Sequence, residues 1–248
     1  MNQVLLITGG SRGIGAATAL LAARAGWDVA INYTRDEAAA QVVAEQVRKH
    51  GQRALVLRAD VASETEVMAM FNAIEREWGK LRGLVNNAGV VDQPSRVDAM
   101  SGARLQRMFA VNVLGSMFCA REAVLRMSTK HGGAGGVIVN LSSAAARLGS
   151  PGQYVDYAAA KGAIDTFTLG LAREVATEGI RVNAVRPGII STEIHASGGL
   201  PDRAQQLAPS VPMQRAGSAE EVAQAILWLL SDQSSYTTGA VIDVTGGR

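Results

Sequence analysis

The feature that most constrains the fold is a regular alternation, along all 248 residues, of short runs rich in β-branched residues with longer stretches of helical periodicity. The short runs predict strands at Val4–Thr8, Asp28–Asn32, Ala54–Arg58, Gly83–Asn86, Gly136–Leu141, Arg181–Val185 and Ala240–Val244. Apolar residues at three- and four-residue spacing predict helices at Gly13–Ala25, Asp36–His50, Ser63–Trp78, Ala103–Met127, Val155–Glu178 and Ala219–Leu230. Strands that alternate with helices pair in parallel through right-handed crossovers, so we expect a doubly wound α/β fold in which helices flank a seven-stranded sheet.

The chain has no visible linker, and we therefore expect a single domain over residues 1–248. The glycine-rich stretch Gly132–Gly136 is too short to separate domains and is typical of a loop before a strand. Residues Ser191–Pro212 are the least patterned part of the chain. Because a long loop inside a compact domain is usually functional, we predict that this segment is a lid over a substrate.

Composition argues against several classes of protein. A formal net charge of +2, spread over the whole chain, gives no basic stripe for nucleic acid. No stretch approaches the roughly 18 continuous apolar residues of a membrane span, and the N-terminal sequence is typical of a strand rather than a signal peptide. We therefore expect a cytoplasmic protein. The single cysteine, Cys119, is interpreted as a core residue, and the isolated His50, His131 and His195 predict no metal site.

A glycine-rich loop connects the first predicted strand to the first predicted helix. Its sequence is Thr8-Gly9-Gly10-Ser11-Arg12-Gly13-Ile14-Gly15. Glycines let the backbone turn sharply and approach a pyrophosphate, whose charge is met by the amides at the helix N-terminus. The position of the loop, with a strand before it and a helix after it, favours a dinucleotide site over a plain turn.

The spacing Gly-x3-Gly-x-Gly resembles that of the short-chain dehydrogenase/reductase family, and further motifs agree along nearly the full chain. These motifs are Asp60-Val61 after the third strand, Asn86-Asn87-Ala88-Gly89 after the fourth, Asn112 in the following helix, Ser142-Ser143 after the fifth strand, Tyr157-x3-Lys161, Pro187-Gly188 with Thr192, and the closing segment Thr238–Gly247. The resemblance implies a Rossmann fold, oxidoreductase activity and a nicotinamide cofactor.

Tyr157 and Lys161 lie four residues apart, so a helix would present them on one face. Hydride addition to a carbonyl leaves an alkoxide that needs a proton, and a nearby ammonium would lower the phenol pKa from its usual value of about 10. The resemblance implies that Tyr157 is the acid/base, that Lys161 lowers its pKa and holds the nicotinamide ribose, that Ser143 binds the substrate oxygen, and that Asn112 maintains a water-linked path to Lys161. Ser142 remains an alternative to Ser143, because the stretch to Tyr157 is one residue longer than the family pattern.

The resemblance also implies a set of cofactor-binding positions. They are Gly9, Ser11, Arg12, Gly13, Ile14, Gly15, Tyr33, Thr34, Arg35, Asp60, Val61, Asn87, Ala88, Gly89, Tyr157, Lys161, Pro187, Gly188, Ile190 and Thr192.

The end of the second strand predicts NADP(H) rather than NAD(H). NAD-binding folds usually place an acid here for the ribose hydroxyls, and this chain has Tyr33 at that place. Arg12 and Arg35 could bind a 2′-phosphate through charge-assisted hydrogen bonds. Asp36 follows directly, but we expect it to cap the next helix and point away from the ribose.

These observations predict an NADP(H)-dependent enzyme that acts on a small-molecule carbonyl or alcohol. Two other functions stay open. The chain also resembles 3-oxoacyl-acyl-carrier-protein reductases, although it has Glu178 where such relatives carry a basic residue. A non-catalytic nucleotide-binding regulator is less favoured, since it would not need Tyr157, Lys161 and Asn112 together with a serine pair. Outward apolar positions on the helices Ala103–Met127 and Val155–Glu178 predict a homotetramer, with a homodimer as the alternative.

Overall fold

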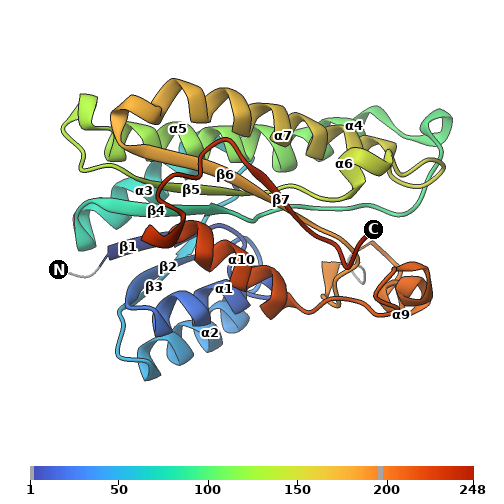
Figure 1. The fold of residues 1–248 in the computed structure, drawn as a ribbon, viewed down its shortest axis with the longest axis horizontal. Coiled ribbons are helices and arrows are strands. Elements are labelled where there is room, and N and C mark those ends of the chain that lie inside the picture. The colour runs from blue at the N-terminus through green and yellow to red at the C-terminus, as the bar shows by residue number, and fades with distance from the viewer. Residues whose placement is uncertain (1–2, 195–197) are drawn as a thin grey trace.

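One parallel sheet of seven strands runs through the molecule (Figure 1). The computed structural model describes residues 3–194 and 198–248. Its strands are β1 Gln3–Ile7, β2 Trp27–Tyr33, β3 Ala54–Arg58, β4 Leu81–Asn86, β5 Gly136–Leu141, β6 Ile180–Pro187 and β7 Val241–Val244. Their order in space is β3-β2-β1-β4-β5-β6-β7, so the chain reverses its winding direction between β1 and β4. In such sheets a crevice opens at the carboxyl ends of the strands beside this switch point.

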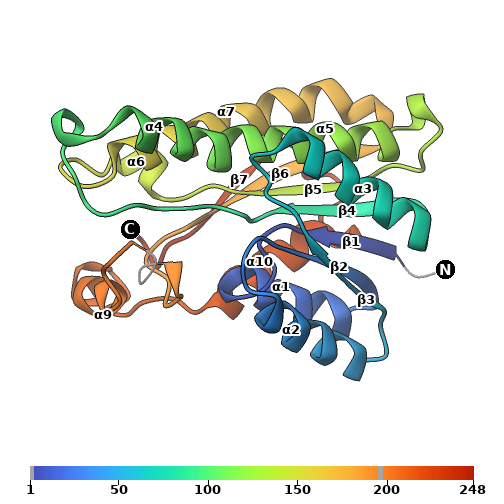
Figure 2. The same ribbon diagram turned by 180° about the vertical axis from the view of Figure 1, so that it is seen from behind.

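Helices cover both faces of the sheet. They are α1 Gly13–Arg24, α2 Glu37–Lys49, α3 Glu64–Trp78, α4 Gly102–Phe109, α5 Gly115–Met127, α6 Ala145–Leu148, α7 Val155–Val175, α9 Arg203–Leu207 and α10 Ala219–Leu230. Figures 1 and 2 show α1, α2 and α10 against one face and α3, α5 and α7 against the other. Each face contributes to its own apolar cluster, which explains why β2 is buried along its whole length.

Side-chain caps fix where several helices begin. The Asp36 carboxylate accepts a hydrogen bond from Ala39 N at 2.9 Å, so the prediction that Asp36 caps α2 is confirmed. Ser218 and Glu221 form a reciprocal capping box at the start of α10. Helix α1 differs, because Arg12 at its N-cap position makes no side-chain hydrogen bond to the first turn. The amides of that turn therefore remain available for another acceptor.

The predicted helix Ala103–Met127 is interrupted. Five residues, Ala110–Leu114, form a π-helical turn between α4 and α5. The stretch Gly102–Met127 is long enough to cross a membrane, and one window of 18 residues within it has a mean hydropathy of 1.4. More than half of that window (56%) is buried inside the fold, and packing against the sheet and α7 accounts for its apolar character.

The prediction that Ser191–Pro212 lacks regular structure was wrong in part. The structure places the helix α9 at Arg203–Leu207, followed by a 3-10 turn at Ala208–Ser210. The segment is also tied to the body of the protein, since Ile190 pairs with Gly217 and Ser191 N donates to Gly217 O at 2.9 Å. The segment between the anchors at Ile190 and Gly217 contains the predicted lid.

Candidate active site

The glycine loop is joined directly to the segment that follows β4. The Asn87 side-chain amide donates to the carbonyls of Thr8 and Gly9, both at 2.9 Å. In return, the Thr8 hydroxyl accepts from the backbone amides of Asn87 and Ala88, both at 3.0 Å. These four bonds hold the two carboxyl-end loops together across the switch point.

The loop has the backbone shape that a phosphate cradle requires. Gly9 and Gly13 have positive φ angles of 60° and 54°, which side-chain-bearing residues rarely adopt. A Cβ at Gly15 would lie 2.6 Å from both Asn87 Nδ2 and Gly9 O, so only glycine fits there. Because α1 also begins without a side-chain cap, its first amides and this tight loop together fit the pyrophosphate of a dinucleotide.

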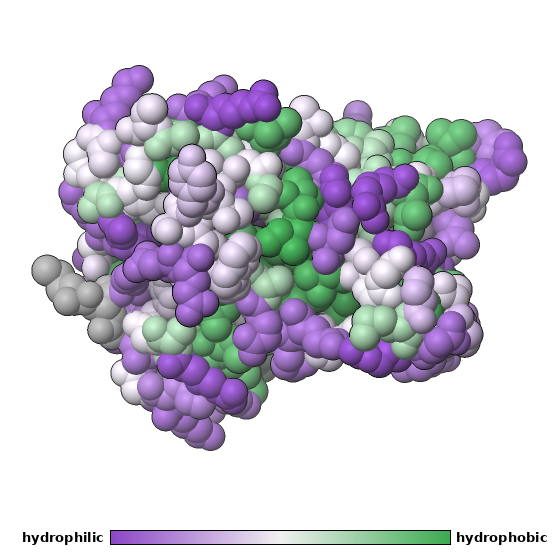
Figure 3. Space-filling view, in the orientation of Figure 1, coloured by the Kyte–Doolittle hydropathy of each residue, from purple (hydrophilic) through white to green (hydrophobic). Residues whose placement is uncertain are grey.

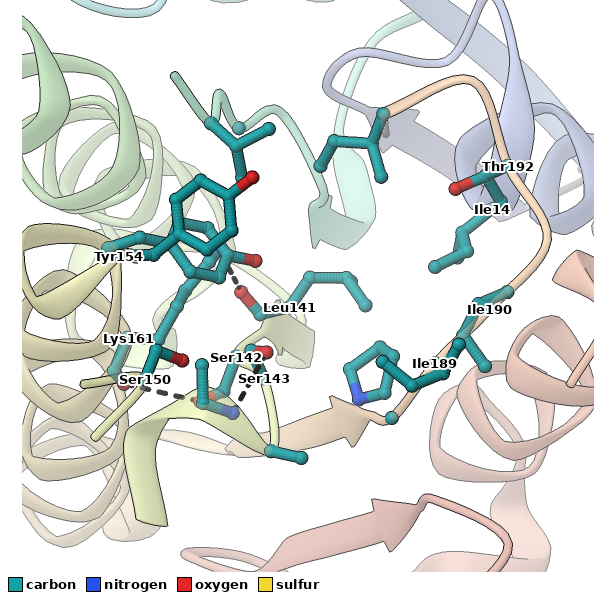
Figure 4. Close-up of a pocket in the computed structure, with 18 of the residues that line it drawn as sticks. Ile14, Leu141, Ser142, Ser143, Ser150, Tyr154, Lys161, Ile189, Ile190 and Thr192 are labelled. Carbon is teal, nitrogen blue, oxygen red and sulfur yellow. Dashed lines mark hydrogen bonds between the residues drawn. The ribbon is translucent and has the colours of Figure 1, made fainter. Parts of the chain in front are cut away.

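An active-site cleft opens beside this loop (Figure 4). Ten of the predicted site residues line it: Ile14, Asn87, Gly89, Ser143, Tyr157, Lys161, Pro187, Gly188, Ile190 and Thr192. The other predicted residues lie outside its lining: Gly9, Ser11, Arg12, Gly13, Gly15, Tyr33, Thr34, Arg35, Asp60, Val61, Ala88 and Asn112. The sequence therefore placed residues from five separate segments around one cavity. In Figure 4, Ser142, Ser143 and Lys161 lie across the cavity from Ile14 and Thr192.

Lys161 is buried at the bottom of the cleft. Only 4% of it is exposed, and its Nζ donates to Leu141 O at 2.7 Å. Burial lowers the pKa of Lys161 to about 8, while the Asp165 carboxylate acts in the opposite direction. Asp165 is itself held by Arg186, whose Nε and Nη2 donate to it at 3.0 and 2.9 Å. The sequence did not predict Leu141 or Arg186, because their contacts form only when α7 packs on β5 and β6. It also missed Asp165, although Asp165 lies four residues after Lys161 on α7.

Tyr157 lies one helical turn before Lys161 on α7. Burial raises the pKa of the Tyr157 phenol to about 12, and a hydrogen bond with Ser143 acts in the opposite direction. The two serines differ in their partners. Ser142 is 3% exposed and its hydroxyl donates to Lys161 O at 3.2 Å, whereas Ser143 interacts with Tyr157 itself.

Asn112 is fully buried on the π-helical turn. Its Oδ1 accepts from Val90 N at 3.1 Å, and its Nδ2 donates to Val90 O and Met108 O, both at 3.0 Å. A Cβ at Gly89 would lie 2.8 Å from Asn112 Oδ1 and 3.7 Å from Lys161 Nζ. Gly89 thus brings Asn112 and Lys161 close to each other, with no direct bond between them among the residues described.

The two predicted phosphate ligands lie on the outside of the loops. Arg12 and Arg35 are exposed, and neither forms an ion pair with any described residue. Thr34, next to Arg35 in the sequence, is also exposed, and its hydroxyl donates to Ala59 O at 3.4 Å.

Tyr33 and Val61 are less accessible than the sequence suggested. Tyr33 is 6% exposed and packs in the apolar cluster beneath α2, while its hydroxyl hydrogen-bonds to Glu37. Burial raises the pKa of Tyr33, and this contact with Glu37 raises it further. Val61 is 4% exposed and packs against Gly115, while Asp60 accepts from Ala62 N at 3.0 Å. Sequence analysis missed Glu37, because Tyr33 ends β2 and Glu37 begins α2, so their contact depends on how the chain turns between the two elements.

The remaining titratable residues do not form a second centre. Among residues 3–194 and 198–248, no group of three or more His, Cys, Asp or Glu side chains could hold a metal ion. Cys119 is buried, and burial raises the pKa of its thiol to about 12, so its interpretation as a core residue is confirmed. His195 lies outside the described residues.

Comparison with known proteins shows full-length similarity to oxidoreductases. Residues 9–248 match the family model described as enoyl-(acyl carrier protein) reductase. The chain is 56% identical over 245 residues to the uncharacterized oxidoreductase YgfF of Escherichia coli, with 99% of both chains covered. It is 35% identical to the 3-oxoacyl-[acyl-carrier-protein] reductase FabG of Staphylococcus aureus, over 100% of this chain and 98% of that one.

A solved structure agrees with the sequence relatives. A short-chain type dehydrogenase/reductase from Mycobacterium marinum superposes with a TM-score of 0.92 at 36% identity, covering 99% of this chain and 94% of the other. The expected Rossmann-like fold is thereby confirmed.

Proposed function

The chain belongs to the short-chain dehydrogenase/reductase family and is an oxidoreductase, and from that membership we propose that it moves a hydride between NADP(H) and a carbonyl or alcohol carbon of a small molecule. One observation carries the proposal. Ser143, Tyr157 and Lys161 line the same cleft as Ile14 of the glycine loop, so proton-transfer groups and a dinucleotide site share one cavity.

The bound cofactor would supply the hydride, and this chain's own residues would manage the proton. Tyr157 gives its phenol proton to the developing alkoxide and takes it back in the reverse direction. Ser143, beside the phenol, donates a hydrogen bond to the same substrate oxygen. The Lys161 ammonium stabilises the phenolate by its charge. Asn112 keeps the π-helical turn in place beside Gly89, and we propose that it anchors a water between that turn and Lys161.

The buried ammonium predicts how the reduction rate depends on pH. Carbonyl reduction needs a protonated Tyr157 and a charged Lys161. Since the pKa of Lys161 is lowered to about 8 whereas that of Tyr157 is raised to about 12, the lysine loses its proton first as the pH rises. We expect kcat/KM for reduction to fall as the pH passes from one unit below the lysine pKa to one unit above it. A Lys161→Met variant should lack this descent. A wild-type rate that stays constant or rises over that window would contradict the assignment.

We propose that the cofactor is NADP(H). The support is the pair of guanidinium groups at Arg12 and Arg35, which form no ion pair with any described residue, together with Tyr33 at the end of β2, where NAD-binding folds usually place an acid. The negative charge of Glu37 would disfavour a 2′-phosphate, but its carboxylate already accepts a hydrogen bond from Tyr33.

We further propose that one domain carries the whole activity and that residues 191–212 close over the substrate. Thr192, Ile194 and Arg203 from this segment line the active-site cleft. Anchoring at Ile190 and Gly217 would let the middle of the segment move while its ends stay fixed.

Exposed apolar side chains support a homotetramer. Phe109 on α4, Leu114 on the π-helical turn and Leu125 on α5 are 39%, 45% and 48% exposed, and Leu169 on α7 is 40% exposed. Figure 3 shows a further apolar area in the middle of one face, between the α7 layer and the segment that carries α9. Such surface is usually covered by another protein. We expect light scattering to give a mass near four times the 25.9 kDa chain. A monomer at micromolar concentration would contradict this prediction without affecting the chemistry.

The similarity to FabG makes 3-oxoacyl-acyl-carrier-protein reduction the second candidate. One contact weighs against it. Glu178, after α7, hydrogen-bonds to the hydroxyl of Ser128, so a carboxylate lies where an acidic carrier protein would require cations. A turnover assay that follows NADPH consumption separates the candidates. We expect free ketones or aldehydes to be reduced at least as efficiently as the carrier-protein thioester. Turnover of the thioester alone would favour the second candidate, and no turnover of any carbonyl would favour a regulator.

A further inference from the structure

The charge of the active-site cleft is one-sided. Among the described residues that line it are three cationic ones, Lys161, Arg203 and Arg248, and no aspartate or glutamate. The proposed chemistry uses Lys161 alone. Two arginines at the wall of a cavity that is otherwise largely apolar therefore need a separate explanation, because an uncompensated cation in such surroundings attracts an anion.

Arg203 is held in place by the wall of the cleft. It lies at the start of α9, and its guanidinium stacks over the Tyr154 ring at 5.1 Å. Its Nη2 donates to Gln153 Oε1 at 2.6 Å. It forms no ion pair with any residue that the structure describes, so its other donors are not committed to a carboxylate.

This position lies away from the predicted phosphate sites. Arg203 contacts Gln153 and Tyr154, which lie just before Tyr157 in the sequence. Figure 4 shows Ser150 and Tyr154 on the side of the cavity opposite Ile14 and Thr192, the residues nearest the glycine loop.

We propose that the substrate is an anionic carbonyl compound, in which Arg203 binds a carboxylate or phosphate group while the reacting carbon faces Tyr157. This inference rests on the proposed function for the identity of the reacting group. Val91, Leu148 and Ile194 line the same cavity and would pack against an apolar chain between the two ends of the substrate. Guanidinium groups match both carboxylate and phosphate oxygens.

Binding of unreactive ligands tests the subsite without any turnover. Hexanoate, hexanamide and hexyl phosphate would each be titrated into the protein–NADP+ complex. The proteins compared are wild type, Arg203→Met, Arg203→Lys and Arg76→Met. Arg76 is a matched control, an arginine whose side chain is 73% exposed on α3. Because a single hydrogen bond from Arg203 to a charged ligand is worth roughly tenfold or more in affinity, we expect wild type and the control to bind an anion at least that much more tightly than the amide. Arg203→Met should abolish this preference and Arg203→Lys should keep part of it.

The two anions decide which oxyanion the site takes. Preference for hexanoate assigns a carboxylate, and preference for hexyl phosphate assigns a phosphate ester. Equal affinity for amide and anions, or a preference that survives Arg203→Met, would overturn the inference. Because no ligand reacts, this outcome is distinct from a failure of the proposed function, which would appear as an absence of carbonyl turnover. Where turnover occurs, the same variants should change the KM ratio of an oxo acid to its methyl ester.

Discussion

Replacing Tyr157 with phenylalanine will lower turnover by roughly 10²–10⁴-fold, the loss typical of removing a general acid. The substitution removes only the hydroxyl, and the ring keeps its packing against Met108, Val113 and Ala160 at the wall of the cleft. NADPH affinity should therefore change little. Lys161→Ala should reduce both turnover and NADPH affinity, because Lys161 is proposed to serve the ribose as well as the phenol.

Tyr236→Phe provides the matched control, since it makes the same chemical change at a fully exposed tyrosine. Steady-state rates on a carbonyl that the wild type reduces, with cofactor affinity from fluorescence titration, are the measurements. Near-native turnover by Tyr157→Phe would show that the proton comes from another group. An equal loss in the Tyr236 variant would show that the effect is not specific to the cleft.

Loss of Arg12 and Arg35 will remove most of a strong preference for NADPH. Each hydrogen bond to a charged group contributes roughly 1.5–3 kcal/mol, and each 1.4 kcal/mol is about tenfold in affinity. If both arginines reach the 2′-phosphate, wild type should bind NADPH at least roughly a hundredfold more tightly than NADH. Both side chains are exposed, so salt should weaken the preference.

Fluorescence titration of both cofactors against wild type and Arg12→Ala/Arg35→Ala measures this directly, with Arg76→Ala as the control. The double variant should lose NADPH affinity and keep its NADH affinity. Adding Thr34→Asp places a carboxylate at an exposed position and should turn the remaining preference toward NADH. Tyr33 is a poorer position for that change, because it is only 6% exposed and already contacts Glu37. Equal wild-type affinities would refute the NADP(H) assignment and leave the catalytic group unaffected.

The sheet was predictable because each strand is short and bounded by turn residues, and all except β3 and β7 are mostly buried. Ala54–Arg58 and Gly136–Leu141 match the structure at both ends, and every other strand is displaced by no more than two residues at either end. Helix α10 was equally predictable from the sequence, since Ser218 caps it and its apolar residues recur at helical spacing. Alternating local patterns of this kind fix the order of elements, and the handedness of the crossovers then fixes the topology.

The parts that the sequence did not reveal depend on tertiary contacts. The π-helical turn at Ala110–Leu114 has no local marker, yet it is what buries Asn112 against Val90. Leu141, which binds Lys161, belongs to β5 and is recognisable as a partner only once α7 is packed on the sheet. Helix α9 is five residues long and too short to show periodicity. Arg203 on that helix was missed for the same reason.

The most direct test of the account follows the hydride itself. The enzyme would be incubated with NADPH that carries deuterium at both hydrogen positions of the reactive nicotinamide carbon, together with a ketone, an aldehyde or an oxo acid, and the product would be analysed by mass spectrometry. The account predicts an alcohol with one deuterium on the former carbonyl carbon, formed in equal amount to the NADP+ produced, and its loss in Tyr157→Phe. An alcohol without deuterium, or cofactor oxidation with no alcohol formed, would contradict hydride transfer in this cleft.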